Sequence, residues 1–149
     1  GDGDIRISNE NSDYFSLLGI LKALSSTYQL PVTVTLGSNY ESGSATAVLV
    51  GNCLRLGITA TRKTASTIGN ITNEEIMKIT INHGGKLDEL YRVDFNTGTE
   101  GGVASLNAQC TTSGETSTIV VRLCATTTAI TSLNGYTVLP ANLNLDAFL

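Results

Sequence analysis

Residue types that perform covalent and acid–base catalysis are sparse in this 149-residue chain. A Ser-His-Asp or Cys-His site needs a histidine base, and the chain contains one histidine, His83, with no GxSxG nucleophile motif to accompany it. His83 precedes Gly84 and Gly85, and paired glycines supply the positive φ angles of a hairpin turn. We therefore predict that His83 is an exposed residue beside a turn and not a catalytic base.

Two pairs of neighbouring carboxylates, Glu74 with Glu75 and Asp88 with Glu89, are the candidates for glycoside hydrolysis. Neighbours on a strand point to opposite faces, so Asp88 and Glu89 are not expected to flank one bond. We interpret both pairs as solvated surface charge and predict that the chain is not an enzyme. A small glycoside hydrolase with a dispersed carboxylate site stays as the last alternative.

The three cysteines, Cys53, Cys110 and Cys124, have the spacing of neither a zinc site nor a redox CxxC pair. One histidine and three scattered thiols do not supply two metal ligands at a usable spacing, so we predict no metal and no other cofactor. Each cysteine lies in an apolar or strand-like stretch, which favours buried free thiols. A Cys110–Cys124 disulfide across a hairpin is the alternative.

The charge of the chain excludes several classes of partner. Nine basic and thirteen acidic residues give a net charge of −4, and no segment concentrates Lys or Arg. This predicts no binding to nucleic acid or to an anionic membrane surface, because both depend on concentrated positive charge. The sequence contains no run of about 18 apolar residues, so we predict no membrane insertion. It begins Gly1-Asp2-Gly3-Asp4, and we expect a processed product or a fragment of a longer protein.

The strongest helical pattern runs from Tyr14 to Tyr28, behind the N-cap candidates Ser12 and Asp13 and before Pro31. Its apolar residues follow the alternating three- and four-residue spacing of a coiled-coil seam, and further apolar residues widen this face. We predict a stem helix with an oligomer interface formed by Tyr14, Leu17, Leu21, Leu24 and Tyr28. The alternative is a helix that covers an open face of its own domain.

Beyond Pro31 apolar and polar residues alternate with the period of two that is typical of strands. Strands are predicted over 32–36, 45–50, 54–60, 77–82, 87–95, 103–110, 119–126 and 136–139. A loop is predicted over 61–73, with Thr72 and Glu75 capping a single helical turn, and Asn134-Gly135 is a strong turn signal.

Hairpin-length connections without crossover helices predict a mainly β fold. We predict a lead-in and stem helix over residues 1–30, followed over 31–149 by an antiparallel β-sandwich or jelly-roll-like domain. An up-and-down barrel is the alternative.

Three predicted turns, at 38–42, 96–101 and 111–115, are rich in small polar residues, and Tyr40 is their main aromatic residue. Loops held on a rigid sheet are common binding surfaces. From the first two turns we predict a receptor-binding surface that contains Tyr40, Glu41, Asn96, Thr99 and Glu100.

This order of parts resembles the distal head of a trimeric phage or virus fibre: an apolar stem helix from Asp13 to Tyr28, then a Thr-, Asn- and Gly-rich β domain that ends in the segment 142–149. The resemblance is one of architecture and covers most of the chain. It implies a homotrimer on the virion surface, with stem helices on a threefold axis and loops that bind a glycan or protein receptor of the host. The alternative is a secreted or cell-surface adhesin, pilus-like subunit or carbohydrate-binding module, for which a Cys110–Cys124 disulfide would be natural.

Overall fold

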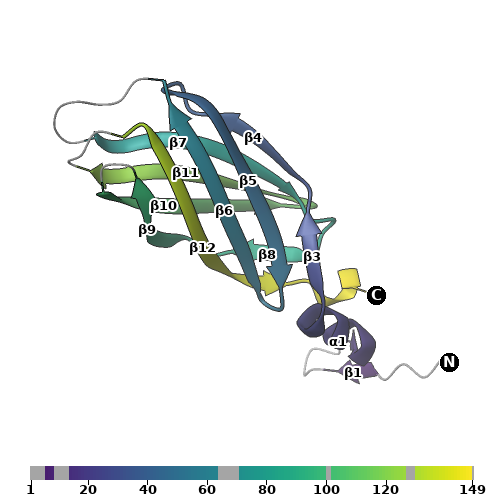
Figure 1. The fold of residues 1–149 in the computed structure, drawn as a ribbon. Helices are drawn as coiled ribbons and strands as arrows, with labels where there is room; N and C mark the ends of the chain where they lie inside the picture. The colour runs from purple at the N-terminus through teal and green to yellow at the C-terminus, as the bar shows by residue number, and fades with distance from the viewer. Residues whose placement is uncertain (1–5, 9–13, 64–70, 100–101, 127–129, 149) are drawn as a thin grey trace.

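The computed structural model describes residues 6–8, 14–63, 71–99, 102–126 and 130–148, and it confirms the prediction of a mainly antiparallel β fold (Figure 1). The first elements are β1 (Arg6–Ser8), β2 (Tyr14–Ser16), α1 (Leu17–Ser25), β3 (Thr27–Leu30), β4 (Val32–Leu36), β5 (Tyr40–Val50) and β6 (Cys53–Arg62). They are followed by β7 (Ile71–Asn82), β8 (Leu87–Leu90), β9 (Val93–Thr99), β10 (Gly102–Ser113), β11 (Thr116–Thr126), β12 (Ser132–Leu143) and the 3₁₀ helix η1 (Leu145–Phe148).

Ten of these strands form one antiparallel sheet in the order β3-β5-β6-β12-β9-β10-β11-β7-β4, with β8 beside β12. The two end strands, β3 and β4, follow each other in sequence and are separated by Pro31 alone, so the sheet nearly closes on itself. Proline has no amide hydrogen to donate, and at this residue the chain changes from pairing with β5 to pairing with β7. The Pro31 carbonyl still accepts a hydrogen bond from the Asn82 amide at 3.0 Å.

Alternation along the strands builds the hydrophobic core. On β6, Leu54, Leu56 and Ile58 are buried while Arg55 and Thr59 are exposed. In Figure 1, β5, β6 and β12 cross in front of β7, β10 and β11. The core is one cluster of buried side chains contributed by both groups of strands, including Leu49, Leu54, Leu56, Ile79, Ile81, Leu106, Ile119, Val121, Leu123 and Leu139. Each such buried side chain contributes about 1.5–3 kcal/mol relative to an exposed one.

The predicted helix from Tyr14 to Tyr28 is wrong at both ends, because α1 covers Leu17–Ser25 only. Residues Tyr14–Ser16 pair with β1, and Thr27–Leu30 pair with Val50–Ala47 of β5. A short helix in water is marginal, so strand pairing supported by tertiary contacts replaces its two ends. The boundary predicted at residue 30 therefore falls between β3 and β4, two strands of the same sheet.

Three other local predictions are corrected by strand pairing. Residues Thr72 and Glu75 lie in β7, so the predicted helical turn is wrong, while residues 64–70 of the predicted loop lie outside the described part. The strand predicted over 87–95 divides at Tyr91–Arg92, because β8 pairs with β12 and β9 pairs with β10. Asn134 and Gly135 lie inside β12 and form no turn.

Gly135 has a packing reason within this strand. A Cβ atom at this position would approach Thr97 Oγ1 to 2.8 Å and the Phe95 ring to 3.3 Å. Glycine therefore allows close approach between β12 and β9, and the Thr97 hydroxyl donates a hydrogen bond to the carbonyl of Asn134.

Candidate functional site

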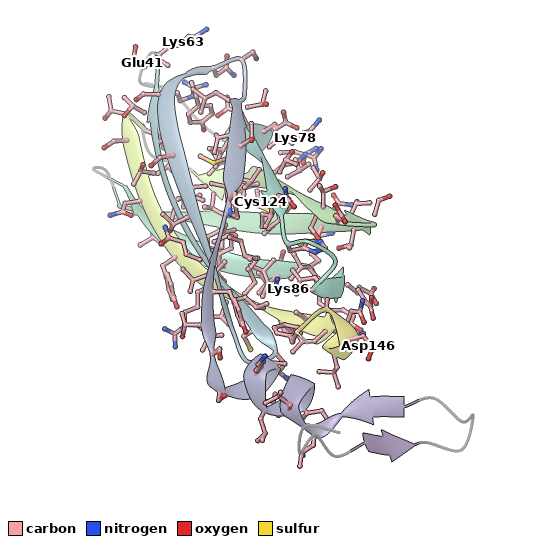
Figure 2. All side chains as sticks on the ribbon, turned by 90° about the vertical axis from the view of Figure 1, so that its right-hand side faces the viewer. Glu41, Lys63, Lys78, Lys86, Cys124 and Asp146 are labelled. Carbon is pink, nitrogen blue, oxygen red and sulfur yellow. The ribbon has the colours of Figure 1, made fainter. Side chains whose placement is uncertain are left out.

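The two ends of the molecule differ in character. One end, called here the helix end, holds α1 and both chain termini (Figure 1). The opposite end, called the loop end, holds the last residues of β4, β6, β9 and β11 and the first residues of β5, β7, β10 and β12, and Figure 2 shows Glu41 and Lys63 there. The third polar turn of the sequence, between β10 and β11, lies away from the loop end. It lies beside the turn between β7 and β8, where the His83 amide donates a hydrogen bond to the Glu115 carbonyl.

The predicted receptor-binding residues have different environments. Tyr40 is only 3% exposed, so the expectation of an exposed aromatic residue at a loop tip is wrong. Glu41 and Asn96 are exposed as predicted, but they lie within β5 and β9 and not in turns, because β5 pairs with β6 and β9 pairs with β10 there. Thr99 ends β9 with its side chain outside the described part, and Glu100 also lies outside the described residues.

Tyr40 is buried because it belongs to a polar cluster that joins three strands at the loop end. Glu74 of β7 accepts hydrogen bonds from the Tyr40 hydroxyl at 2.8 Å and from Arg62 Nη2 at 2.9 Å. Burial alone would raise the pKa of Glu74, but hydrogen bonds from Arg62, Tyr40 and Asn39 outweigh burial and lower this pKa. The lowered pKa keeps Glu74 charged, and its hydrogen bonds tie β5, β6 and β7 together at the loop end.

The second carboxylate pair lies at the surface. Asp88 and Glu89 are both exposed on β8, in agreement with the interpretation as surface charge. Within the described ranges, no group of three or more His, Cys, Asp or Glu side chains lies close enough together to hold a metal ion. Across the same part of the chain, no helix is long and apolar enough to span a bilayer.

The cysteine thiols are separate and half-buried. Cys110 of β10 lies opposite Ile119 of β11, and Cys124 lies five residues farther along β11. At about 3.4 Å per residue this separation is about 17 Å, whereas a disulfide needs Cα atoms within about 7 Å. The alternative of a Cys110–Cys124 disulfide is therefore wrong. Burial raises the pKa of the Cys110 thiol to about 12, which keeps it protonated.

His83 is also placed differently from the prediction, because its side chain is 1% exposed. Its Nδ1 accepts a hydrogen bond from the Leu87 amide at 3.3 Å, which closes the turn between β7 and β8. Burial lowers the pKa of His83, and nearby Lys86 lowers it further, while the Thr116 backbone, Asp88 and Glu115 act in the opposite direction. The neutral imidazole is thus the form that fits the fold.

We expect the free energy of unfolding to fall as the pH is lowered from 7 to 5.5. His83 has a lower pKa in the folded state than in the unfolded state, so its contribution is complete above about pH 6.5 and is lost as the pH falls through the folded-state value. One proton limits the slope to about 1.4 kcal/mol per pH unit. Chemical denaturation at several pH values measures it.

The control for this prediction is His83→Asn, whose Oδ1 can replace Nδ1 as acceptor for the Leu87 amide. Since the chain has a single histidine, the variant should lose most of the pH dependence in this window. Equal slopes for the two proteins would contradict the assignment.

The five residues of the predicted oligomer interface lie on three elements, β2, α1 and β3. Leu17 is half-buried, whereas Leu21 and Leu24 are 54% and 59% exposed, and Leu18 beside them is also exposed. Tyr14 lies on β2 with its side chain outside the described part. Tyr28 lies on β3. Three of the five predicted residues thus share one helix.

Tyr28 serves a contact within the chain. Its ring meets Phe148 of η1 edge to face, with ring centroids 5.4 Å apart, and Lys86 Nζ lies 5.5 Å from the Tyr28 centroid. This contact joins the C-terminal helix to the sheet, near the labelled Lys86 and Asp146 in Figure 2. Tyr28 is therefore half-buried within its own chain, and only part of its side chain could contact a partner.

An open groove of about 670 Å³, lined mainly by Ser, Thr, Asn, Gly and Ala residues with Leu133, lies at the loop end, across β5, β6, β12 and β9. Strand register aligns Ser44 opposite Thr59, Thr59 opposite Asn134, and Asn134 opposite Gly98. Successive strands lie about 4.8 Å apart, so this row of four residues is about 14 Å long. We call it the central row.

Two parallel rows flank the central row on the same outward face. Ser42, Thr61 and Ser132 form the row nearer the loops, and Thr46, Gly57 and Tyr136 form the row nearer the helix end. A smaller hollow of about 210 Å³, lined also by Gly57, adjoins the groove and shares Ser44, Thr59 and Asn134 with it. The two hollows together form a trough whose lining combines hydroxyl and amide groups with small apolar groups.

Sequence reasoning missed this trough, although its residues occupy every second position of strands. Ser42, Ser44 and Thr46 alternate on β5, and Asn134 and Tyr136 alternate on β12. The period indicates an outward face, but the period does not say which strands are neighbours.

Comparison with known proteins gave no matching family model and no significant match among curated proteins or solved structures.

Proposed function

We propose that this chain is a non-enzymatic fibre head on a virion surface, which assembles as a homotrimer through its helix end and binds a host-surface receptor with its loop end. The single observation that carries the proposal is the opposite placement of an exposed leucine face and a polar trough along one rigid sheet. A fibre head needs two different ends, because one end must attach to the fibre and the other must stay accessible to the receptor.

The leucine face of α1 supports assembly with two further copies of the chain. Leu18, Leu21 and Leu24 are all exposed, and apolar groups gathered on a surface typically mark an interface. The helix has nine residues, or about 13 Å, which is too short for an independent coiled coil. In the proposed trimer the leucines of three helices therefore pack around the axis as a small apolar base.

We further propose that the sheet acts as a β-sandwich, with β3-β5-β6-β12 as one layer and β9-β10-β11-β7-β4 as the other. The pairing of β12 with β9 is short, since it includes only Leu133 with Thr99 and Asn134 with Gly98. A division of the sheet at this junction supports the two-layer arrangement.

The test of the proposed function is the native mass of the protein at micromolar concentration, measured by sedimentation equilibrium or native mass spectrometry. We expect three times the chain mass of 15.6 kDa, which is about 47 kDa. A mass of 15.6 kDa under these conditions would refute the fibre-head assembly.

A monomeric carbohydrate-binding module on a cell surface is the second candidate function. The polar trough favours this candidate independently of α1, because ligand binding in the trough does not require a trimer. A monomer that binds a saccharide would support the module and exclude the trimeric head.

A further inference from the structure

The lining of the trough restricts the charge of what it can bind. Among the residues that the structure describes, its side chains are hydroxyl, amide, methyl and isobutyl groups or the hydrogen of glycine, and none of these is charged. Proteins bind phosphate, sulfate and carboxylate groups with Arg, Lys or helix N-termini, and the described residues that line the trough include none of these. Arg55, an exposed base on the same face, lies outside the trough, one row beyond Tyr136. The net charge of −4 also disfavours anions. A ligand matched to this surface is uncharged.

The position of the trough argues against an extended peptide. A peptide that adds to a sheet needs a free strand edge with unpaired backbone groups. Along the central row, β5, β6 and β12 are already paired with one another through Ser44, Thr59 and Asn134. The trough therefore presents side chains and not a free backbone edge, and it suits a ligand that hydrogen-bonds through many hydroxyl groups.

An exposed aromatic residue lies beside the trough, in the row next to its central row. Tyr136 is 59% exposed and lies opposite Gly57, whose missing side chain helps to form the smaller hollow. An aromatic ring packs against the apolar C–H face of a sugar, while Ser, Thr and Asn groups bind its hydroxyls. A large exposed tyrosine beside small polar residues supplies both kinds of contact.

Two polar groups of the central row are already ordered. Ser44 Oγ and Thr59 Oγ1 lie 2.7 Å apart and share a hydrogen bond, which orients their remaining donor and acceptor positions. At the far end of the row, a Cβ atom added to Gly98 would meet no atom within 4 Å. The space above Gly98 is thus open to a ligand.

From these contacts we propose that the trough between Gly98 and Tyr136 binds an uncharged oligosaccharide. Asn134 lies at its centre, Ser44 and Thr59 provide ordered hydroxyls, and Tyr136 provides the stacking surface. This inference rests on the proposed function in taking the loop end as the receptor-binding end. It names the class of receptor as a neutral glycan.

The experiment probes the full chain in its native assembly with an immobilised panel of uncharged oligosaccharides and with sialylated and sulfated counterparts. We expect binding to members of the uncharged set. Gly98→Leu should abolish binding, because its side chain enters open space within the trough without a steric conflict. The matched control is Thr111→Leu, which adds the same side chain at an exposed position of β10 outside the trough and should bind as the unmodified protein does.

Two substitutions of Tyr136 distinguish stacking by its ring from hydrogen bonding by its hydroxyl group. Tyr136→Ala should weaken binding about tenfold, whereas Tyr136→Phe retains the ring and should bind nearly as well as the unmodified protein. Circular dichroism establishes that each variant is folded.

The inference is overturned if the protein binds no uncharged oligosaccharide, binds charged glycans alone, or binds equally well with Gly98→Leu. Each of these results leaves the trimeric head standing if the native mass is that of a trimer. A monomer that binds uncharged glycans and loses binding with Gly98→Leu would refute the head and support the trough.

Discussion

Replacement of Gly37 by alanine is expected to destabilise the fold more than the same replacement at the other glycines that the structure describes. A Cβ atom at this position would lie 2.0 Å from the Glu75 carbonyl oxygen and 2.9 Å from its carbon. Overpacking of side chains costs about 1–3 kcal/mol, and main-chain atoms cannot rotate away as side chains can. We therefore expect a loss of at least about 3 kcal/mol in the free energy of unfolding, measured by chemical denaturation.

The close approach at Gly37 has a structural origin. Its amide donates a 2.8 Å hydrogen bond to the Ile76 carbonyl, which holds the β4–β5 connection against β7. The matched control is Gly98→Ala, because a Cβ atom there meets nothing within 4 Å. If Gly37→Ala and Gly98→Ala unfolded at the same denaturant concentration, the contact between this connection and β7 would be wrong.

The double substitution Leu21→Glu with Leu24→Glu is expected to convert the proposed trimer into monomers. Both side chains are more than half exposed within one chain, so the fold itself should change by no more than about 0.5 kcal/mol. In the trimer they would be buried, and even Leu21→Ala should then weaken assembly by about 2–5 kcal/mol. Sedimentation measures the assembly, and chemical denaturation of the monomer measures the fold.

Lys22→Glu is the control for this experiment. It changes the net charge by −2, as the two leucine substitutions together do, and it lies at an exposed position of the same helix. We expect the Lys22→Glu variant to remain trimeric. Retention of the trimer by the double leucine variant would show that α1 is not the interface, whereas dissociation of both variants would indicate a charge effect.

Local patterns located most of the strands. The alternation at 54–60 and 119–126 matches β6 and β11, because one buried and one exposed face impose a period of two on any strand. The glycines that follow His83 also marked a real turn, in which Gly84 and Gly85 have φ angles of 61° and 82°.

Local patterns failed where distant segments competed. The helical pattern at Thr27 and Tyr28 was overruled by pairing with β5, and the turn signal Asn134-Gly135 was overruled by pairing with β6 and close approach to β9. The sequence predicted that Tyr40 is an exposed loop residue. In the structure it is enclosed in a hydrogen-bonded cluster with Arg62 and Glu74, which are 22 and 34 residues away in sequence.

The amino-acid sequence by itself determined that this chain forms antiparallel strands with an apolar helix before them, because burial on one face is a local demand on neighbouring residues. The tertiary structure alone decided which strands lie side by side, and therefore that Ser44, Thr59, Asn134 and Gly98 form one polar row. Strand register depends on contacts between residues far apart in sequence, and a period of two carries no information about them.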